Sequence, residues 1–394
     1  MARNNNLQIT RFMKTSLTLI TLSIIMCMTS CGPEYSKPVE ASQKGFAISF
    51  FNSVNKMTPK GENVVVSPYS AAVALSMLAE GAEGETRVEF DNALGRVLYK
   101  AEDLGGNDTV KVESANSVWV DDNFSIRNRY VSLLQNDFDA FITTQNFADP
   151  ATVKAINNWC SENTNGKIDN IIDRLDPGMV MVLANALYFN APWEDEFDPS
   201  MTTEQVFHGV TKDTDVKMMS RKAFYNYAEY NGIQMIHLPY AGMKYGMYVV
   251  LPPKGADIDK LLPEVTPAAL DAAFGMFAQE EVRFSMPKFR LETSMVLNKA
   301  LNNMGIKTAF TSAADFGGIA EMGPLVLDQV KQKCFIDVAE KGTEAAAVTV
   351  GQIRLTSVRP VQNVKTMKVD RPFVFLISDL ENKNILFAGK IVNL

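Results

Sequence analysis

The fold is decided by one stretch near the C-terminus, Glu340-Lys341-Gly342-Thr343-Glu344-Ala345-Ala346-Ala347-Val348-Thr349-Val350. If the stretch is extended, one face carries only small side chains, those of Thr343, Ala345, Ala347 and Thr349. Side chains of this size can enter a crowded sheet interior. Gly342 gives the backbone freedom to turn, and no charged residue after Glu344 opposes burial for several positions. The stretch therefore predicts a segment that can become a strand, and the β-branched residues 348–350 disfavour the alternative of an Ala-rich helical turn.

Outward from this stretch, helical and strand-like patterns alternate along the chain. Apolar spacing predicts helices at 44–56, 70–80, 150–163, 258–262, 267–277 and 294–304, and strands at 64–66, 114–120, 179–189, 216–219, 234–239, 245–251, 282–287, 327–338, 372–378 and 385–392. No repeat or heptad pattern divides the 394 residues, so we expect one large α+β unit. Residues 342–372 lack core periodicity, and a loop of that length is usually functional or disordered.

Composition and motifs argue against several functional classes. The net charge of −7 comes without a clustered basic stripe, so we expect no nucleic-acid partner. The two histidines, His208 and His237, belong to no hydrolase or metal motif, and His237 is predicted to be a structural histidine with its hydrogen bonds satisfied. We therefore predict no enzyme, no cofactor and no metal site.

The N-terminus has the layout of an export signal. Arg3, Arg11 and Lys14 precede the apolar run 17–28, which is short for a membrane span. Thr29-Ser30-Cys31-Gly32 resembles the lipobox of bacterial lipoproteins, in which the cysteine is acylated. This predicts a signal peptide at 1–30 and a lipid-anchored tether at 31–43, and hence an exported lipoprotein, periplasmic or on the cell surface. An ordinary signal peptide with an incidental Cys31, giving a secreted protein, is the alternative.

Beyond the leader, only Cys160 and Cys334 remain, which is too few for a disulfide framework. Both stand in apolar surroundings, so we predict buried, unreactive thiols.

Several motifs together resemble one family, the serpins. The likeness to the hinge of that family begins at Glu340 and runs to Ala347. Further motifs are Asn63-Val64-Val65-Val66-Ser67-Pro68-Tyr69-Ser70, Gly81-Ala82-Glu83-Gly84-Glu85-Thr86, Asn185-Ala186-Leu187-Tyr188-Phe189, Pro287-Lys288-Phe289, Arg371-Pro372-Phe373-Val374-Phe375 and Leu386-Phe387-Ala388-Gly389-Lys390. The resemblance covers the chain from about Phe46 to Leu394, and so many motifs in order make a chance likeness implausible.

The resemblance implies a serpin domain at 44–394, with three β-sheets, about nine helices and an exposed reactive-centre loop at about 340–368. It implies hinge residues Glu340, Gly342, Thr343, Ala345, Ala346 and Ala347. It also implies a set beneath and beside the main sheet, called the shutter and the breach, formed by Ser67, Ser70, Asn185, Trp193 and Gln332. The family often has a histidine where Gln332 stands; an amide can replace its hydrogen bonds to Ser67 and Asn185, but not its pH response.

In the family, a protease attacks the loop, forms an acyl-enzyme and is trapped when the cleaved loop inserts into the main sheet. The small hinge side chains therefore imply an irreversible inhibitor that forms a covalent complex as a monomer. Serine endopeptidases are the expected targets, with cysteine endopeptidases as a further class. The alternative is a non-inhibitory serpin that acts as a binding or folding-assistant lipoprotein.

The reactive bond stays open at this point. Counting from the hinge gives Thr356-Ser357, and counting back from Pro372 gives Val361-Gln362. Arg354 lies close to the hinge, and Arg359 is followed by a proline, so Lys365-Thr366 is the cleanest trypsin-like site. Val358, Val361 and Val364 suit elastase-like enzymes, which leads us to expect a broad spectrum with more than one usable bond.

Overall fold

The structure is a computed structural model, and it describes residues 42–96, 99, 104, 109–321, 325–343, 364–381 and 383–394. The predicted signal peptide, most of the tether with Cys31, the hinge residues Ala345, Ala346 and Ala347, and the bond candidates Thr356, Ser357 and Val361 lie outside these residues. Every described segment belongs to the unit Pro38–Leu394.

Eight α-helices and three short 3-10 helices occur in the described part of the chain, against the nine or so expected. The α-helices are α2 (Gln43–Met57), α3 (Pro68–Gly81), α4 (Gly84–Ala93), α5 (Asn128–Phe138), α6 (Pro150–Glu162), α7 (Ile258–Leu261), α8 (Pro267–Phe274) and α9 (Asn298–Asn303), and the 3-10 helices are η1 (Pro199–Met201), η2 (Leu262–Glu264) and η3 (Thr308–Phe310). Within the same ranges, no helix has the length and apolar character needed to cross a membrane.

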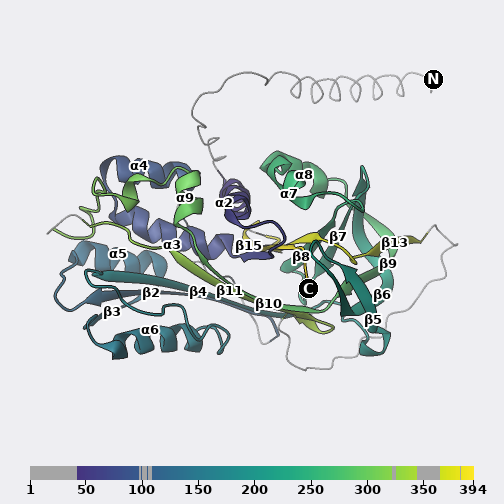
Figure 1. Cartoon of the computed structure of the whole chain (residues 1–394), viewed down its shortest axis with the longest axis horizontal. Helices are drawn as coiled ribbons and strands as arrows, with labels where there is room; N and C mark the ends of the chain where they lie inside the picture. The colour runs from purple at the N-terminus through teal and green to yellow at the C-terminus, as the bar shows by residue number, and fades with distance from the viewer. Residues whose placement is uncertain are drawn as a thin grey trace, which may run out of the picture. The chain divides into compact units, whose positions relative to one another are not determined.

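One sheet has six strands in the order β10-β11-β12-β4-β2-β3 (Figure 1). Its strands are β2 (Lys111–Asp121), β3 (Ala140–Gln145), β4 (Met181–Pro192), β10 (Phe289–Val296), β11 (Lys331–Ala339) and β12 (Gly342–Thr343). Helix α3 contacts β4 on one face of this sheet, while α6 lies on the other face (Figure 1). The predicted strands 114–120, 179–189 and 327–338 are thus all members of one sheet.

The second sheet has nine strands in the order β1-β15-β14-β8-β7-β6-β9-β13, with β5 also paired to β6. They are β1 (Val64–Val66), β5 (Thr203–His208), β6 (Asp213–Tyr230), β7 (Ile233–Pro239), β8 (Tyr245–Leu251), β9 (Ala278–Pro287), β13 (Lys365–Lys368), β14 (Phe373–Asp379) and β15 (Ile385–Ile391). The 18-residue β6 pairs with β9 along one part and with β7 along another. The resemblance implied three sheets. In the structure, the long strand β6 joins two of them into one nine-stranded sheet.

Helix α3 shows how local sequence places an element. The Ser67 side chain accepts from Ser70 N at the N-cap and Pro68 occupies the first turn, a favourable start for a helix. The small-residue face allows a close approach, because a Cβ at Gly81 would lie 2.2 Å from Ile319. The same helix also packs against both β4 and β15, and it therefore connects the two sheets.

Several predictions are wrong in their boundaries. The strand predicted at 216–219 is the 18-residue β6, and the helix predicted at 267–277 ends at Phe274. Residues 294–296 of the expected helix 294–304 belong to β10, because they pair antiparallel with residues 331–333 of β11, and the helix begins only at Asn298. The helices α4 and α5 and the strands β3, β5 and β13 were not predicted.

Candidate functional site

The short strand β12 lies between β11 and β4. Thr343 pairs with Val338 of β11 and with Ala191 of β4, and Gly342 pairs with Ala339 and Pro192. Across the residues that the structure describes, β11 and β4 form no ladder with each other, and β12 alone joins them. The six-stranded sheet therefore has two parts, β10-β11-β12 and β4-β2-β3. Only the two residues of β12 connect them.

The two residues of β12 fit their position closely. A Cβ at Gly342 would lie 2.1 Å from the carbonyl oxygen of Ala191, so only glycine is accommodated there. The Thr343 side chain is 3% exposed, and its hydroxyl lies 2.5 Å from the hydroxyl of Tyr240, which is itself buried. Burial raises the pKa of Tyr240 well above its usual range, so this phenol stays protonated and hydrogen-bonded. Bulk or charge at either position would meet both steric and solvation penalties.

Trp193 fixes the chain just before β12. Its indole Nε1 donates to the carbonyl of Ala339 at 3.0 Å, and its backbone N–H donates to the carbonyl of Lys341 at 2.8 Å. The indole also stacks on Tyr240 with ring centroids 4.5 Å apart and an interplanar angle of 11°. One aromatic residue therefore contacts both the end of β11 and the partner of Thr343.

Glu340 is held from two sides. Its carboxylate accepts from Lys288 Nζ at 2.7 Å and from Thr202 Oγ1 at 2.9 Å, while its backbone carbonyl accepts from Phe197 N at 2.8 Å. Burial opposes ionisation of this carboxyl, but the hydrogen bonds from Lys288 and Thr202 outweigh it and lower the Glu340 pKa. The carboxylate is thus charged at neutral pH and anchors the turn into β12.

The predicted shutter residues form two hydrogen-bonded sets, which are linked because Ser70 N donates to the Ser67 side chain at 3.2 Å. Gln332 of β11 accepts from Ser67 N at 3.0 Å and donates to Ser67 O at 2.9 Å. Ser70 donates to Asn185 Oδ1, and Asn185 in turn donates to Asn116 Oδ1 at 2.6 Å. The predicted hydrogen bond between Gln332 and Ser67 is present through the backbone of Ser67, whereas Asn185 bonds to Ser70 and Asn116 instead of Gln332.

Residues 41–394 match a family model described as Serpin (serine protease inhibitor). The chain belongs to the serpin family. An uncharacterized serpin-like protein of Thermococcus kodakarensis is 32% identical over 375 residues, covering 91% of this chain and 86% of the relative. The thermophilic serpin tengpin in its native state superposes with a TM-score of 0.81 at 30% identity, covering 94% of this chain and 96% of tengpin. Human thyroxine-binding globulin, complexed with its hormone, gives 0.79 at 26% identity, with 89% and 97% covered.

The bond that the sequence favours for trypsin-like proteases, Lys365-Thr366, lies in a paired strand of this serpin. Lys365 and Thr366 belong to β13 and pair parallel with Val282 and Arg283 of β9. A protease binds an extended, accessible segment, so this pairing disfavours a cut between these two residues. Val364 directly precedes the strand.

Three residues of the serpin site were not singled out from the sequence for their role: Tyr240, Thr202 and Asn116. Each is remote in sequence from its partner: the residue numbers differ by 103 for Tyr240 and Thr343 and by 138 for Thr202 and Glu340. Lys288 belongs to one of the motifs that resemble the family, Pro287-Lys288-Phe289. The motif did not predict that Lys288 pairs with Glu340.

The remaining titratable candidates play no part in the site. His237 is buried and stacked on Tyr248, but its Nε2 has no hydrogen-bond partner among the residues that the structure describes. Within that part of the chain, the prediction of a satisfied histidine is wrong for this atom. Burial lowers the His237 pKa to about 4 and raises the pKa of both Cys160 and Cys334 to about 12, which agrees with the prediction of unreactive thiols. The described segments contain no cluster of three potential metal ligands.

Proposed function

We propose that this serpin is an irreversible, broad-spectrum inhibitor of serine and, secondarily, cysteine endopeptidases, which traps the acyl-enzyme by inserting its cleaved loop between β4 and β11. The observation that carries the proposal is β12. Gly342 and Thr343 already occupy the first positions of an additional strand, while β4 and β11 below them remain unpaired with each other. A longer strand in this place would pair with the backbone N–H and C=O groups along the facing edges of β4 and β11. The hydrogen bonds gained would drive insertion.

The register of β12 supports a choice among the reactive bonds. Gly342 pairs with Pro192 and Thr343 with Ala191, so the same antiparallel register carried down β4 would set Ile353 opposite Met181, the first residue of that strand. A bond at Thr356-Ser357 would then lie just beyond the end of the sheet. We propose this bond as the principal site, because a protease attached there is drawn fully to the far end.

Bonds further along the loop fit less well. After cleavage at Val361-Gln362, about eight residues would extend past the end of β4, and each extended residue spans about 3.3 Å. This extra length of chain would leave the attached protease away from the end of the sheet, so its active site would not be distorted. Val361 and Val364 are therefore proposed as secondary, substrate-like cleavage sites, and Lys365-Thr366 as the least favourable bond.

The experiment mixes the full-length serpin with trypsin-like, elastase-like and papain-like proteases and examines the products on denaturing gels. The expected result is a complex that survives denaturation and, with the elastase-like protease, a C-terminal fragment that begins at Ser357. A fragment beginning at Thr366 in the trapped complex would contradict the register argument. Cleavage by every protease without any complex would contradict the trapping mechanism.

A matched pair of variants at Thr343 tests insertion itself. Thr343→Arg places a charge and a long side chain in a site that is 3% exposed, so we expect a protein that is cleaved but does not trap. Thr343→Ser keeps a small side chain and the hydroxyl that bonds to Tyr240, and is expected to trap normally. Equal trapping by both variants would contradict insertion through β12.

We further propose that the protein is exported, acylated at Cys31 and active as a membrane-anchored monomer. The support is the lipobox-like sequence Thr29-Ser30-Cys31-Gly32 alone. Metabolic labelling with a fatty-acid analogue, compared between the wild type and Cys31→Ala, tests the anchor. Label retained in the variant would contradict it.

The second candidate is a non-inhibitory binding protein. It is favoured by the likeness to thyroxine-binding globulin, a structure of which is a complex with thyroxine. The Thr343→Arg variant would have no effect on such a protein, which separates the two functions.

A further inference from the structure

The end of β4 leads into a short segment, residues 193–197, which holds the hinge from one side and is called the clip. Trp193 N donates to the carbonyl of Lys341, and Phe197 N donates to the carbonyl of Glu340, each at 2.8 Å. These two bonds fix the backbone directly before β12. The position of the clip therefore sets the position at which β12 starts.

The first half of the clip is fixed through its backbone. Trp193 forms a β-bridge with Tyr240, and Glu194 N donates to the carbonyl of Pro239 at 2.9 Å. The second half, from Asp195 onward, belongs to no strand or helix. A side chain from another strand supplies a further anchor there.

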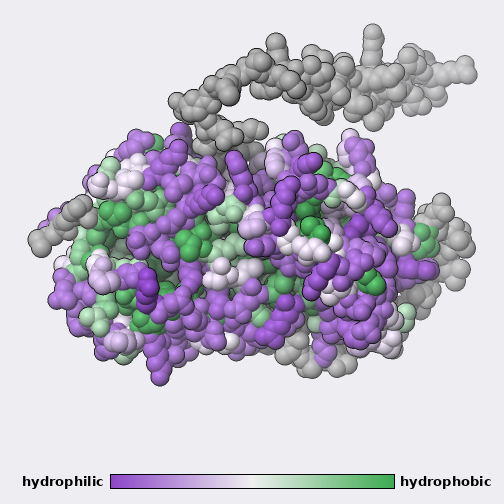
Figure 2. Space-filling view, in the orientation of Figure 1, coloured by the Kyte–Doolittle hydropathy of each residue, from purple (hydrophilic) through white to green (hydrophobic). Residues whose placement is uncertain are grey.

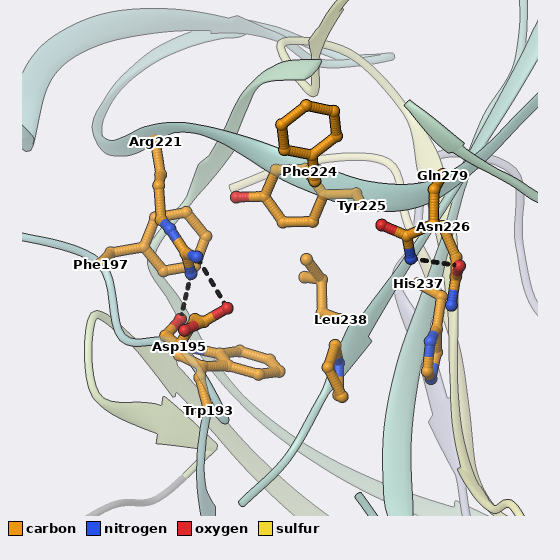
Figure 3. A pocket seen from close by; sticks show the side chains of 11 residues that line it. Trp193, Asp195, Phe197, Arg221, Phe224, Tyr225, Asn226, His237, Leu238 and Gln279 are labelled. Atoms are coloured by element: carbon orange, nitrogen blue, oxygen red, sulfur yellow. Dashed lines mark hydrogen bonds and ion pairs between the residues drawn. The ribbon is translucent and has the colours of Figure 1, made fainter. Parts of the chain in front are cut away.

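This anchor is an arginine of β6 that binds the clip twice. Arg221 Nη2 lies 2.8 Å from Asp195 Oδ2, and Nη1 donates to the backbone carbonyl of Asp195 at 2.6 Å. Figure 3 shows the guanidinium directed toward Asp195, on the side where Trp193 and Phe197 lie. The backbone of Arg221 pairs with Phe284 of β9, within the nine-stranded sheet. The guanidinium therefore ties the hinge of one sheet to a strand of the other.

The surroundings of Arg221 favour this double contact. Its guanidinium carbon lies 5.7 Å from the centroid of the Tyr225 ring, which stands four residues further along the same face of β6. The planar fork of arginine can bond a carboxylate and a carbonyl together, which an ammonium group does less well. The surface around β5 and β6 is largely hydrophilic (Figure 2), and the side chains of Arg221 and Asp195 are 23% and 37% exposed. Salt therefore screens the ion pair more than the bond to the carbonyl.

We propose that Arg221 is a positioning residue for loop insertion, which acts through the clip on β12. Insertion extends a strand that already has two residues, so its first step depends on how firmly those residues are held. If the clip moves more freely, the backbone before β12 must be ordered during insertion, which costs conformational entropy. Insertion then becomes slower relative to hydrolysis of the acyl-enzyme. The effect on insertion rests on the proposed trapping function, whereas the effect on the clip does not.

The first test measures hydrogen exchange in the full-length protein by mass spectrometry. The side chain in Arg221→Gln is too short for both bonds, so we expect the amide hydrogens of residues 193–197 to exchange about fivefold faster. Arg127→Gln is the matched control, because Arg127 makes the same two kinds of bond elsewhere, to the carbonyl of Gly317 at 2.7 Å and to Glu321 Oε1 at 3.0 Å. The control should leave exchange in the clip unchanged.

The second test counts the serpin molecules that are cleaved for each protease molecule trapped. We expect this ratio to rise about threefold in Arg221→Gln and to keep the wild-type value in Arg127→Gln, even where both variants lose the same thermal stability. Asp195→Asn loses the charge but keeps the bond from Arg221 Nη1 to the backbone carbonyl. Its ratio should lie between those of the wild type and Arg221→Gln and should depend less on salt than the wild-type ratio.

The two tests together separate the possible outcomes. Unchanged exchange in the clip of Arg221→Gln would overturn the proposal, and so would an unchanged ratio in a variant whose clip exchanges faster. An equal rise of the ratio in Arg127→Gln would overturn it as well, because general destabilisation would then set the ratio. If even the wild type traps no protease, the trapping function fails, while hydrogen exchange still decides whether Arg221 holds the clip.

Discussion

The interactions of the Glu340 carboxylate with Lys288 and Thr202 allow a numerical prediction for a substitution at Glu340. The Glu340 side chain is 12% exposed and makes two charge-assisted hydrogen bonds, to Lys288 and Thr202. Each such bond contributes about 1.5–3 kcal/mol, but Glu340→Gln can keep part of the bond to Thr202 and relieves the cost of burying a charge. Lys288 is 38% exposed, so water can solvate it when its partner is removed. We expect Glu340→Gln to weaken the anchor by about 2 kcal/mol, a factor of about 30 in the opening of the hinge.

Glu340→Lys should be worse, because it sets two ammonium groups against each other. The exchange variant Glu340→Lys with Lys288→Glu restores one pair of opposite charges and is the control. The assay follows the rate at which each variant loses inhibitory activity at elevated temperature, alongside its unfolding midpoint. Identical rates for the wild type and Glu340→Lys, or an exchange variant no better than Glu340→Lys, would refute the role assigned to this ion pair.

Three further outcomes follow from the buried polar groups. Gln332→His should be less stable than the wild type below about pH 6.5 by about 1–2 kcal/mol, since a protonated imidazole cannot accept from Ser67 N; equal urea unfolding curves at pH 5.5 would contradict this. His237 has a folded pKa of about 4, below its unfolded value of about 6.5, so its contribution to stability is complete above pH 6.5 and about 3 kcal/mol is lost as the pH falls from 7 to 4. His237→Phe should lack that part of the pH dependence in the same unfolding assay. Cys160 and Cys334 should resist a thiol reagent at pH 8 until the protein unfolds, and labelling of the native protein would disprove their burial.

Elements with a strong local pattern were predictable. The helix expected at 44–56 is found at Gln43–Met57, and the strand expected at 245–251 is Tyr245–Leu251. Helix α5 was missed although Tyr130, Leu134 and Phe138 recur every four residues and are buried, a spacing that predicts a helical face. Strand β10 was misread because Ser294-Met295-Val296 is short, and only pairing with β11 decides its conformation.

The candidate site shows a different limit. Small side chains and a glycine identified Gly342 and Thr343 as a segment able to enter a sheet, and both are found in β12. Their partners outside β11 come from chain regions more than a hundred positions away, such as Tyr240 and Ala191, and no local pattern encodes that proximity. The register that favours Thr356-Ser357 likewise depends on the pairing of β12 with β4, which exists only in three dimensions.

The location of β14 and β15 has a consequence for the fate of a cut molecule. These C-terminal strands lie between β1 and β8, and every residue of β15 is buried. A break anywhere in residues 344–363 would therefore leave two polypeptides that elute together in gel filtration. The shorter one stays bound because its strands β14 and β15 are paired with β8 and β1 of the longer one. The nicked protein is in effect a heterodimer made from a single gene product, and its small subunit is recovered only under denaturing conditions.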